Sequence, residues 1–143
     1  MTTALGFDVG TRLIGVAIGN SFTGNARPLD VIRVRDGEPD WAFLDRLVKQ
    51  WSPDTLVVGL PLTLDGGNQP ITRHARRFAE QAGQRYKLPV AMRDERHSSQ
   101  EAARRFANAR AAGTQKRRDA EKIDALAAAV ILEAWLGAAP ARP

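Results

Sequence analysis

The chain has 143 residues, about the length of one domain, and 43% of them are hydrophobic, which is enough for a single core. It contains no cysteine and only two histidines. Disulfide scaffolds, iron–sulfur clusters, thiolate zinc sites and cysteine nucleophiles are therefore excluded, and we expect a cytoplasmic protein whose metal ligands, if any, are carboxylate oxygens.

The first third of the chain predicts an antiparallel meander of three strands. Residues 5–10 and 14–19 are apolar segments joined by a link of hairpin size. Residues 29–34 form a third apolar segment, which is entered through Arg27-Pro28. Strands joined by such short links run antiparallel.

From Pro39 onward, predicted helices alternate with predicted strands. Apolar residues recur at three- and four-residue spacing from Trp41 to Trp51, which is typical of an amphipathic helix packed on a core. A second helix opens at Asn68 or Pro70 and runs to about Tyr86. The remaining predicted elements are strands at 55–60 and 88–93, a helix that begins at the capping box Ser98–Glu101, and a long helix at 119–136.

This order of elements predicts one α/β domain that covers residues 1–143. Its five-stranded mixed sheet combines the three-strand meander with two strands parallel to the first, and helices flank it. Residues 136–143 are expected to form a flexible tail. No apolar run approaches the roughly 20 residues of a membrane span, and Met1 is followed by a strand rather than a signal peptide, so no membrane association is expected.

Asp8 is a carboxylate in the middle of an otherwise apolar predicted strand. An unpaired charge is costly to bury there, so such a residue is usually paired or bound to a cation. Gly10 and Gly15 flank it and remove side chains where a ligand or another backbone segment comes close. The alternative is a structural aspartate that caps the hairpin turn.

Asp94 and Glu95 follow the predicted strand 88–93. Ligands of parallel α/β sheets collect at the carboxyl ends of the strands, which favours a functional role for one of these acids. The alternative is that they complement the N-terminus of the next helix or pair with Arg93 and Arg96.

Asp124 lies at the edge of the apolar stripe of the last predicted helix, on the side that faces the sheet. Glu121 lies one turn earlier on the same side. An acid among inward alanine, leucine and isoleucine residues needs a partner, which is either a nearby arginine or a metal.

Three inward carboxylates from two strand ends and one helix can converge on Mg²⁺ or Mn²⁺. Two such ions about 4 Å apart can activate a water and stabilise the leaving oxygen in phosphodiester hydrolysis. The formal net charge of +5 fits this chemistry, because all of the excess lies between Arg96 and Lys122, where eight basic residues stand against three acids. Such a stretch can contact phosphates, or it can be a solvated helical surface.

Four motifs, in this order, resemble the YqgF family, also called RuvX. They are Asp8-Val9-Gly10-Thr11-Arg12-Leu13-Ile14-Gly15-Val16-Ala17, Gly59-Leu60-Pro61-Leu62 with Asp65-Gly66, Asp94-Glu95-Arg96, and Lys122-Ile123-Asp124 with the alanine-rich helix after it. The resemblance extends from about Leu5 to Leu136. It implies an RNase H-like fold related to the RuvC Holliday-junction resolvases, and a nuclease that matures the 5′ end of small-subunit ribosomal RNA or resolves DNA junctions.

The resemblance also implies the site. Asp8, Glu95 and Asp124 are the expected catalytic acids, and they would hold two Mg²⁺ or Mn²⁺ ions. The expected nucleic-acid contacts are six basic residues: Arg12, Arg96, Lys116, Arg117, Arg118 and Lys122. The expected partners are RNA or branched DNA and ribosomal precursor particles, and both a monomer and a dimer remain open.

The chain departs from the family pattern in two places. His97 stands where the family usually has leucine. The related RuvC-like enzymes carry a glutamate at the end of the fourth strand, where this chain has no acid until Asp65. The second carboxylate therefore comes from Glu95 or, as the alternative, from Asp65. A strand two places from the first lies about 10 Å from it, so we expect an open acid cluster.

Two other functions compete with a nuclease. Asp8, Gly10 and Thr11 with Gly15 also resemble the phosphate-binding hairpin of the actin and sugar-kinase ATPases, but those enzymes close two domains around ATP, and this length predicts one. The second rival is a non-catalytic RNA-binding ribosome-assembly factor, which would need the basic stretch and not the acids.

Overall fold

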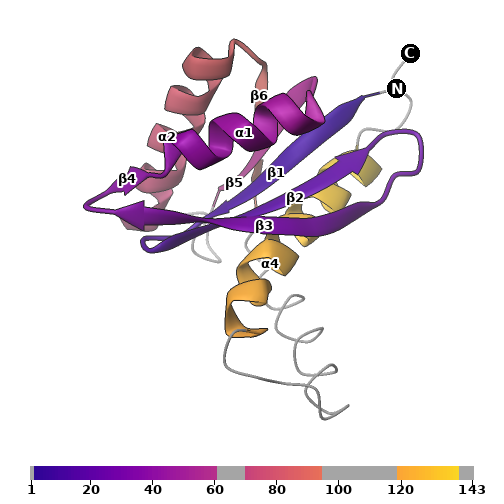
Figure 1. Cartoon of the computed structure of the whole chain (residues 1–143). Coiled ribbons are helices and arrows are strands. Elements are labelled where there is room, and N and C mark those ends of the chain that lie inside the picture. Colours follow the sequence, from indigo (N-terminus) through magenta and orange to yellow (C-terminus); the bar gives the residue numbers. More distant parts are fainter. Residues whose placement is uncertain (1, 61–69, 95–118, 139–143) are drawn as a thin grey trace.

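The computed structural model describes residues 2–60, 70–94 and 119–138 (Figure 1). These residues form six strands and three helices. In chain order they are β1 (Thr3–Val9), β2 (Leu13–Asn20), β3 (Ala26–Arg35), β4 (Glu38–Pro39), α1 (Trp41–Trp51), β5 (Thr55–Leu60), α2 (Pro70–Tyr86), β6 (Val90–Asp94) and α4 (Asp119–Ala138). None of the helices in these ranges is both long and apolar enough to span a membrane.

The strands form one mixed sheet in the order β4-β3-β2-β1-β5-β6. β1 pairs antiparallel with β2, and β2 with β3, so the predicted meander is confirmed. β5 pairs parallel with β1, and β6 with β5, so both later strands run parallel to the first, as expected. β1 therefore lies inside the sheet, and β6 lies two places from it.

The prediction of five strands was wrong by one. β4 is a two-residue strand that pairs back onto the end of β3. The turn between them contains Asp36 and Gly37, which both have positive φ angles, 51° and 78°. Asp-Gly in this conformation closes a tight hairpin. A strand of two residues is too short to leave an alternating hydrophobic pattern, so the sequence did not reveal it.

Two other expectations concern the later part of the chain. The helix predicted from Ser98 lies outside the described residues. α4 continues to Ala138, and Leu136, where the tail was expected to begin, is buried. The apolar contact of Leu136 with the core holds the last turn of the helix, so the predicted tail begins too early.

The sheet separates two hydrophobic cores, with α1 and α2 on one face and α4 on the other (Figure 1). Leu5, Phe7 and Val9 of β1 pack toward α1 and α2, where the ring of Phe7 meets that of Phe78 edge-on at 5.1 Å. Ala4 and Gly6, at the alternate positions of β1, pack toward α4. Trp41 and Trp51 pack against the first core, as expected for the amphipathic helix they bound, and Trp135 packs against the second.

A polar clamp joins α1 to α2 outside the first core. The Arg85 guanidinium donates two hydrogen bonds of 2.8 Å to the Asp45 carboxylate, and the Tyr86 hydroxyl donates a third of 2.7 Å. Arg85 also lies over the Trp41 ring, 5.3 Å from its centroid. The hydrogen bond from Arg85, with that from Tyr86, lowers the pKa of Asp45 to about 2.

We predict that Asp45→Asn lowers the melting temperature at pH 7. The pKa of Asp45 is below its ordinary value in the folded protein, so its contribution to stability is complete above about pH 4 and is lost as the pH falls toward 2. Thermal unfolding of the variant and the wild type from pH 7 to pH 2 should show a difference that shrinks across this range. Glu80→Gln, a charge change at an exposed position of α2, is the control. A pH-independent difference would contradict the assigned role of the ionised carboxylate.

Candidate active site

Asp8 lies in β1 on the face of the sheet that α4 covers. Its neighbours Phe7 and Val9 are buried on the opposite face, so the alternation of the strand directs Asp8 toward α4. The residue is half-buried. A charged group thus occupies an interior strand of the sheet, as the sequence predicted.

Gly15 explains how α4 reaches this place. It stands directly opposite Asp8 in the register of β1 and β2. A Cβ atom on Gly15 would overlap the main-chain carbonyl oxygen of Asp124. The backbone of α4 therefore rests on β2 beside Asp8, and the interpretation of Gly15 as a point of close backbone approach is confirmed.

A second contact fixes the direction of α4. A Cβ atom on Gly6 would lie 2.8 Å from Cβ of Leu132 and 3.1 Å from the carbonyl oxygen of Ala128. From Gly6 to Asp8 the strand advances about 7 Å, and from Ala128 to Asp124 the helix advances about 6 Å. Both steps lead from the Gly6 contact to the Gly15 contact. The structure therefore brings Asp8 and Asp124 to the same place, and each residue has interaction partners within the protein.

The third predicted acid comes from the end of β6. The last pair of the β5–β6 register joins Leu60 to Asp94, and Glu95, the next residue, lies outside the described residues. The choice between Asp94, Glu95 and Asp65 therefore stays a prediction. Within the described ranges no group of three histidine, cysteine, aspartate or glutamate side chains gathers to hold a metal, and Asp8 and Asp124 supply two.

The predicted nucleic-acid contacts are only partly described. Arg12 is exposed in the β1–β2 hairpin, where its carbonyl oxygen accepts a hydrogen bond of 2.8 Å from the Val34 amide. Lys122 lies in α4, two residues before Asp124. The other predicted contacts, Arg96, Lys116, Arg117 and Arg118, lie outside the described residues, as does His97.

Two arginines that the sequence analysis did not assign lie on the same face as Asp8. Arg33 stands opposite Leu13 in the β2–β3 register and is exposed. Arg93 stands opposite Gly59, two residues after Ala91, which packs in the core beneath α4. Ile32 is buried on the opposite face, so the next residue, Arg33, points to the face of Asp8. The sequence alone does not give the register with Leu13 that this placement needs.

Comparison with solved structures defines the class of fold. The chain superposes on the structure of T. thermophilus RuvC in complex with Holliday junction substrate with a TM-score of 0.55, at 18% identity, over 96% of this chain and 97% of that one. It superposes on the Fowlpox virus resolvase in complex with Holliday junction DNA with a TM-score of 0.56, at 9% identity, over 96% and 99% of the two chains. The fold is therefore the RNase H-like fold of the RuvC-type resolvases.

Sequence comparison defines the family. The RuvX model, described as Holliday junction resolvase, matches residues 2–138, and the chain belongs to this family. A protein of Xanthomonas axonopodis pv. citri is 58% identical over 136 residues, which are 95% of this chain and 88% of the relative. A protein of Xanthomonas campestris pv. campestris is 55% identical with the same coverage, and both are named as candidate pre-16S rRNA nucleases. The family predicted from the four motifs is confirmed.

We predict that Gly15→Ala displaces α4 and with it Asp124. The added methyl group would overlap main-chain atoms, which cannot move aside as a flexible side chain can. The free energy of unfolding should fall by about 1–3 kcal/mol, the usual cost of overpacking. Chemical denaturation measures this change.

Gly137→Ala is the matched control. Gly137 lies in α4, the helix that Gly15 contacts, and nothing lies within 4 Å of its Cβ position. Its stability should be unchanged or slightly raised, since alanine favours a helix more than glycine does. A Gly15→Ala protein as stable as the control would contradict the close contact between β2 and α4.

Proposed function

We propose that this chain is a metal-dependent nuclease that hydrolyses phosphodiester bonds through a site built on Asp8 and Asp124. One observation carries the proposal: the Gly15 contact sets the backbone of Asp124 beside the strand that holds Asp8. An interior strand and a helix packed directly on it support this arrangement, because they fix the backbone positions of the two residues. Membership of the RuvX family gives the same class of enzyme, a nuclease.

The donor set fits a divalent cation with oxygen ligands. Asp8 and Asp124 would hold it, with Glu95 as the proposed third ligand, and Mg²⁺ and Mn²⁺ are the ions that suit carboxylates. When bound, two such ions supply an activated water and stabilise the leaving oxygen of the phosphodiester. Thiol nucleophiles are excluded, because the chain contains no cysteine.

The residues of the chain itself supply position and charge. β1 fixes Asp8 within the sheet, and α4 fixes Asp124 through its backbone contact, so neither carboxylate depends on a loop for its place. Arg12, Arg33 and Arg93 lie at the hairpin and on the same face as Asp8, and they can neutralise phosphates on either side of the scissile bond.

The proposed substrate is the precursor of small-subunit ribosomal RNA, cleaved near its 5′ end, and the proposed setting is the ribosomal precursor particle in the cytoplasm. The names of the Xanthomonas relatives support this substrate. The description of the RuvX model supports a second candidate, a four-way DNA junction. A non-catalytic RNA-binding factor is the third, and it would bind RNA without using the acids.

We predict that Asp8→Asn and Asp124→Asn each reduce cleavage by about 10²–10³-fold, because each removes a ligand from an ion that stabilises the transition state by several kcal/mol. Wild type and variants are incubated in Mg²⁺ or Mn²⁺ with a precursor rRNA and, separately, with a four-way DNA junction. EDTA should abolish cleavage, and restored metal should recover it.

Asp36→Asn, at an exposed turn position, is the control for the lost charge. Thermal unfolding should show both active-site variants folded, and equal or greater stability is expected because each relieves repulsion between acids. If Asp124→Asn unfolds the protein, Asp124 is a structural partner. Cleavage that survives complete chelation would rule out the metal mechanism.

We also predict a separate role for the basic stretch. Replacing Lys116, Arg117 and Arg118 together by alanine should weaken nucleic-acid binding for all sequences and flatten its dependence on salt by up to about 2–3 log units per log unit of salt. Cleavage at saturating substrate should fall much less, since the acids are untouched. Fluorescence anisotropy across a salt series measures the slope. An unchanged slope would assign these residues to a solvated surface.

A further inference from the structure

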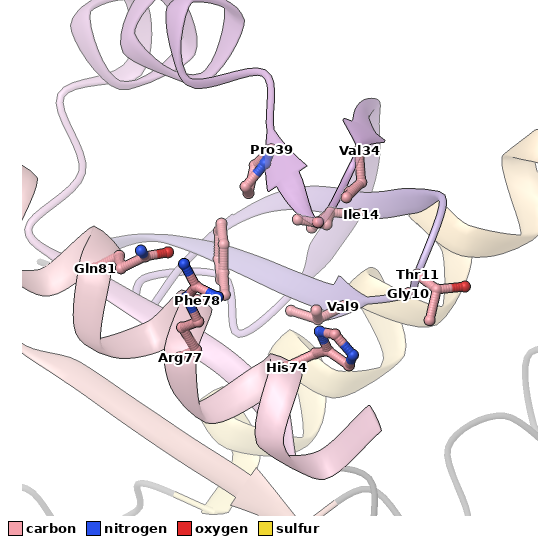
Figure 2. Close-up of a pocket in the computed structure, with 11 residues that line it drawn as sticks. Val9, Gly10, Thr11, Ile14, Val34, Pro39, His74, Arg77, Phe78 and Gln81 are labelled. Carbon is pink, nitrogen blue, oxygen red and sulfur yellow. The ribbon is translucent and has the colours of Figure 1, made fainter. Parts of the chain in front are cut away.

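A pocket lies on the opposite face of the sheet from Asp8 and Asp124, between α2 and two strand hairpins (Figure 2). In Figure 2 the side chains of His74, Arg77 and Gln81 come from α2, Val34 and Pro39 lie on the other side of the pocket, and Val9 lies beside His74. Thr11, Ile14 and Phe78 also line it.

The polar part of this lining suits a phosphate group. Arg77 offers a guanidinium, which matches the oxygens of a phosphate in geometry and charge. His74 lies one turn earlier on the same face of α2, and its imidazole carries at least one N–H donor. Thr11, exposed in the β1–β2 hairpin, adds a hydroxyl. Three donors thus surround one cavity, and its floor is apolar.

A carboxylate now pairs with the arginine. Nη2 of Arg77 lies 3.3 Å from Oε1 of Glu38, and the two side chains are 66% and 54% exposed. An ion pair this open to water contributes little to stability, so a phosphate can displace Glu38 from Arg77. Glu38 therefore competes with an anionic ligand, and its removal should strengthen binding.

The position of the pocket links it to the acid site. Val9 lines the pocket, and Asp8, the residue before it, lies on the face covered by α4. The exposed residues Thr11 and Arg12 form the hairpin between the two faces. A chain of phosphates that passes over this hairpin can reach both places.

We propose that the pocket of His74 and Arg77 is a phosphate subsite, which holds the backbone of the nucleic-acid strand that is cut at Asp8 and Asp124. The assignment of the phosphate to a nucleic acid rests on the proposed function. Free phosphate is the other source of the same chemistry, and the experiment separates the two.

Arg77→Gln and Arg76→Gln form a matched pair of variants. Both remove one positive charge from an exposed position of α2, but only Arg77 lines the pocket. Binding of a fluorescein-labelled single-stranded RNA is measured by anisotropy in EDTA, where no cleavage occurs. Arg77→Gln should weaken binding about fivefold and flatten the salt slope by about 0.7, the value for one phosphate contact to a single strand. Arg76→Gln should change binding less than about twofold by the same reasoning.

Glu38→Gln tests the same site with the opposite sign, and it should tighten binding. If Arg77→Gln fails to fold, the effect of Glu38→Gln on RNA binding tests the subsite by itself. Equal effects of Arg76→Gln and Arg77→Gln, or no effect of Glu38→Gln, would overturn the subsite. Inorganic phosphate, followed through the NMR signals of the His74 imidazole, is the second arm. Saturation by millimolar phosphate, with RNA binding unaffected by Arg77→Gln, would assign the pocket to free phosphate and overturn its link to the strand.

The two proposals fail in different ways. If the wild type cleaves neither the precursor rRNA nor the junction in Mg²⁺ or Mn²⁺, the nuclease proposal fails. The contrast between Arg77→Gln and Arg76→Gln in EDTA still reports on the pocket, because it needs neither metal nor cleavage. If that contrast is absent while cleavage is intact, only the subsite is lost.

Discussion

The contact between Gly15 and the backbone of Asp124 is the constraint on which the proposed site depends. A helix packed on a sheet normally stands off from it by the thickness of the side chains between them. Here the missing side chain of Gly15 admits the helix backbone next to the strand position of Asp8. The small residues Ala128 and Ala129 continue the close packing along α4. The backbones of Asp8, near the start of the chain, and Asp124, near its end, thereby lie close together.

The same packing offsets the cost of placing a charge in the sheet. Asp8 is half-buried between the buried residues Phe7 and Val9, and the apolar packing on both faces offsets the cost of its charge. Phe7 supplies the packing toward α2, where it meets Phe78, and Ala4 and Gly6 supply it toward α4. The polar clamp of Asp45 and Arg85 joins α1 to α2 over the first of these layers. The packed layers on both faces thus stabilise the interior strand that holds Asp8, on which the proposed site is built.

The sequence predicted the parts of the structure that depend on local patterns. Alternating and continuous apolar runs located β1, β2 and β5, and the glycine beside Asp8 predicted a close approach that the structure confirms. The sequence did not locate β4, because a two-residue strand has no period. It also did not place Arg33 on the face of Asp8, because that requires the register with Leu13. The third acid stays a prediction, since its position depends on residues after Asp94. The pocket on the other face also escaped prediction, because α2 and the two hairpins that line it are brought together only by the fold.

The alternation of side chains along β1 places the end of this strand at both proposed sites. Asp8 and Val9 are neighbours in sequence, yet the first faces α4 and the second lines the pocket beside α2. A single strand end can therefore present an acid site on one side and a cationic pocket on the other, separated only by the short hairpin of Thr11 and Arg12. Negative carboxylates that bind cations and positive side chains that bind phosphates would neutralise each other if they were mixed on one surface. The sheet keeps the two groups on separate faces, which is the arrangement that the proposed nuclease site and phosphate subsite require.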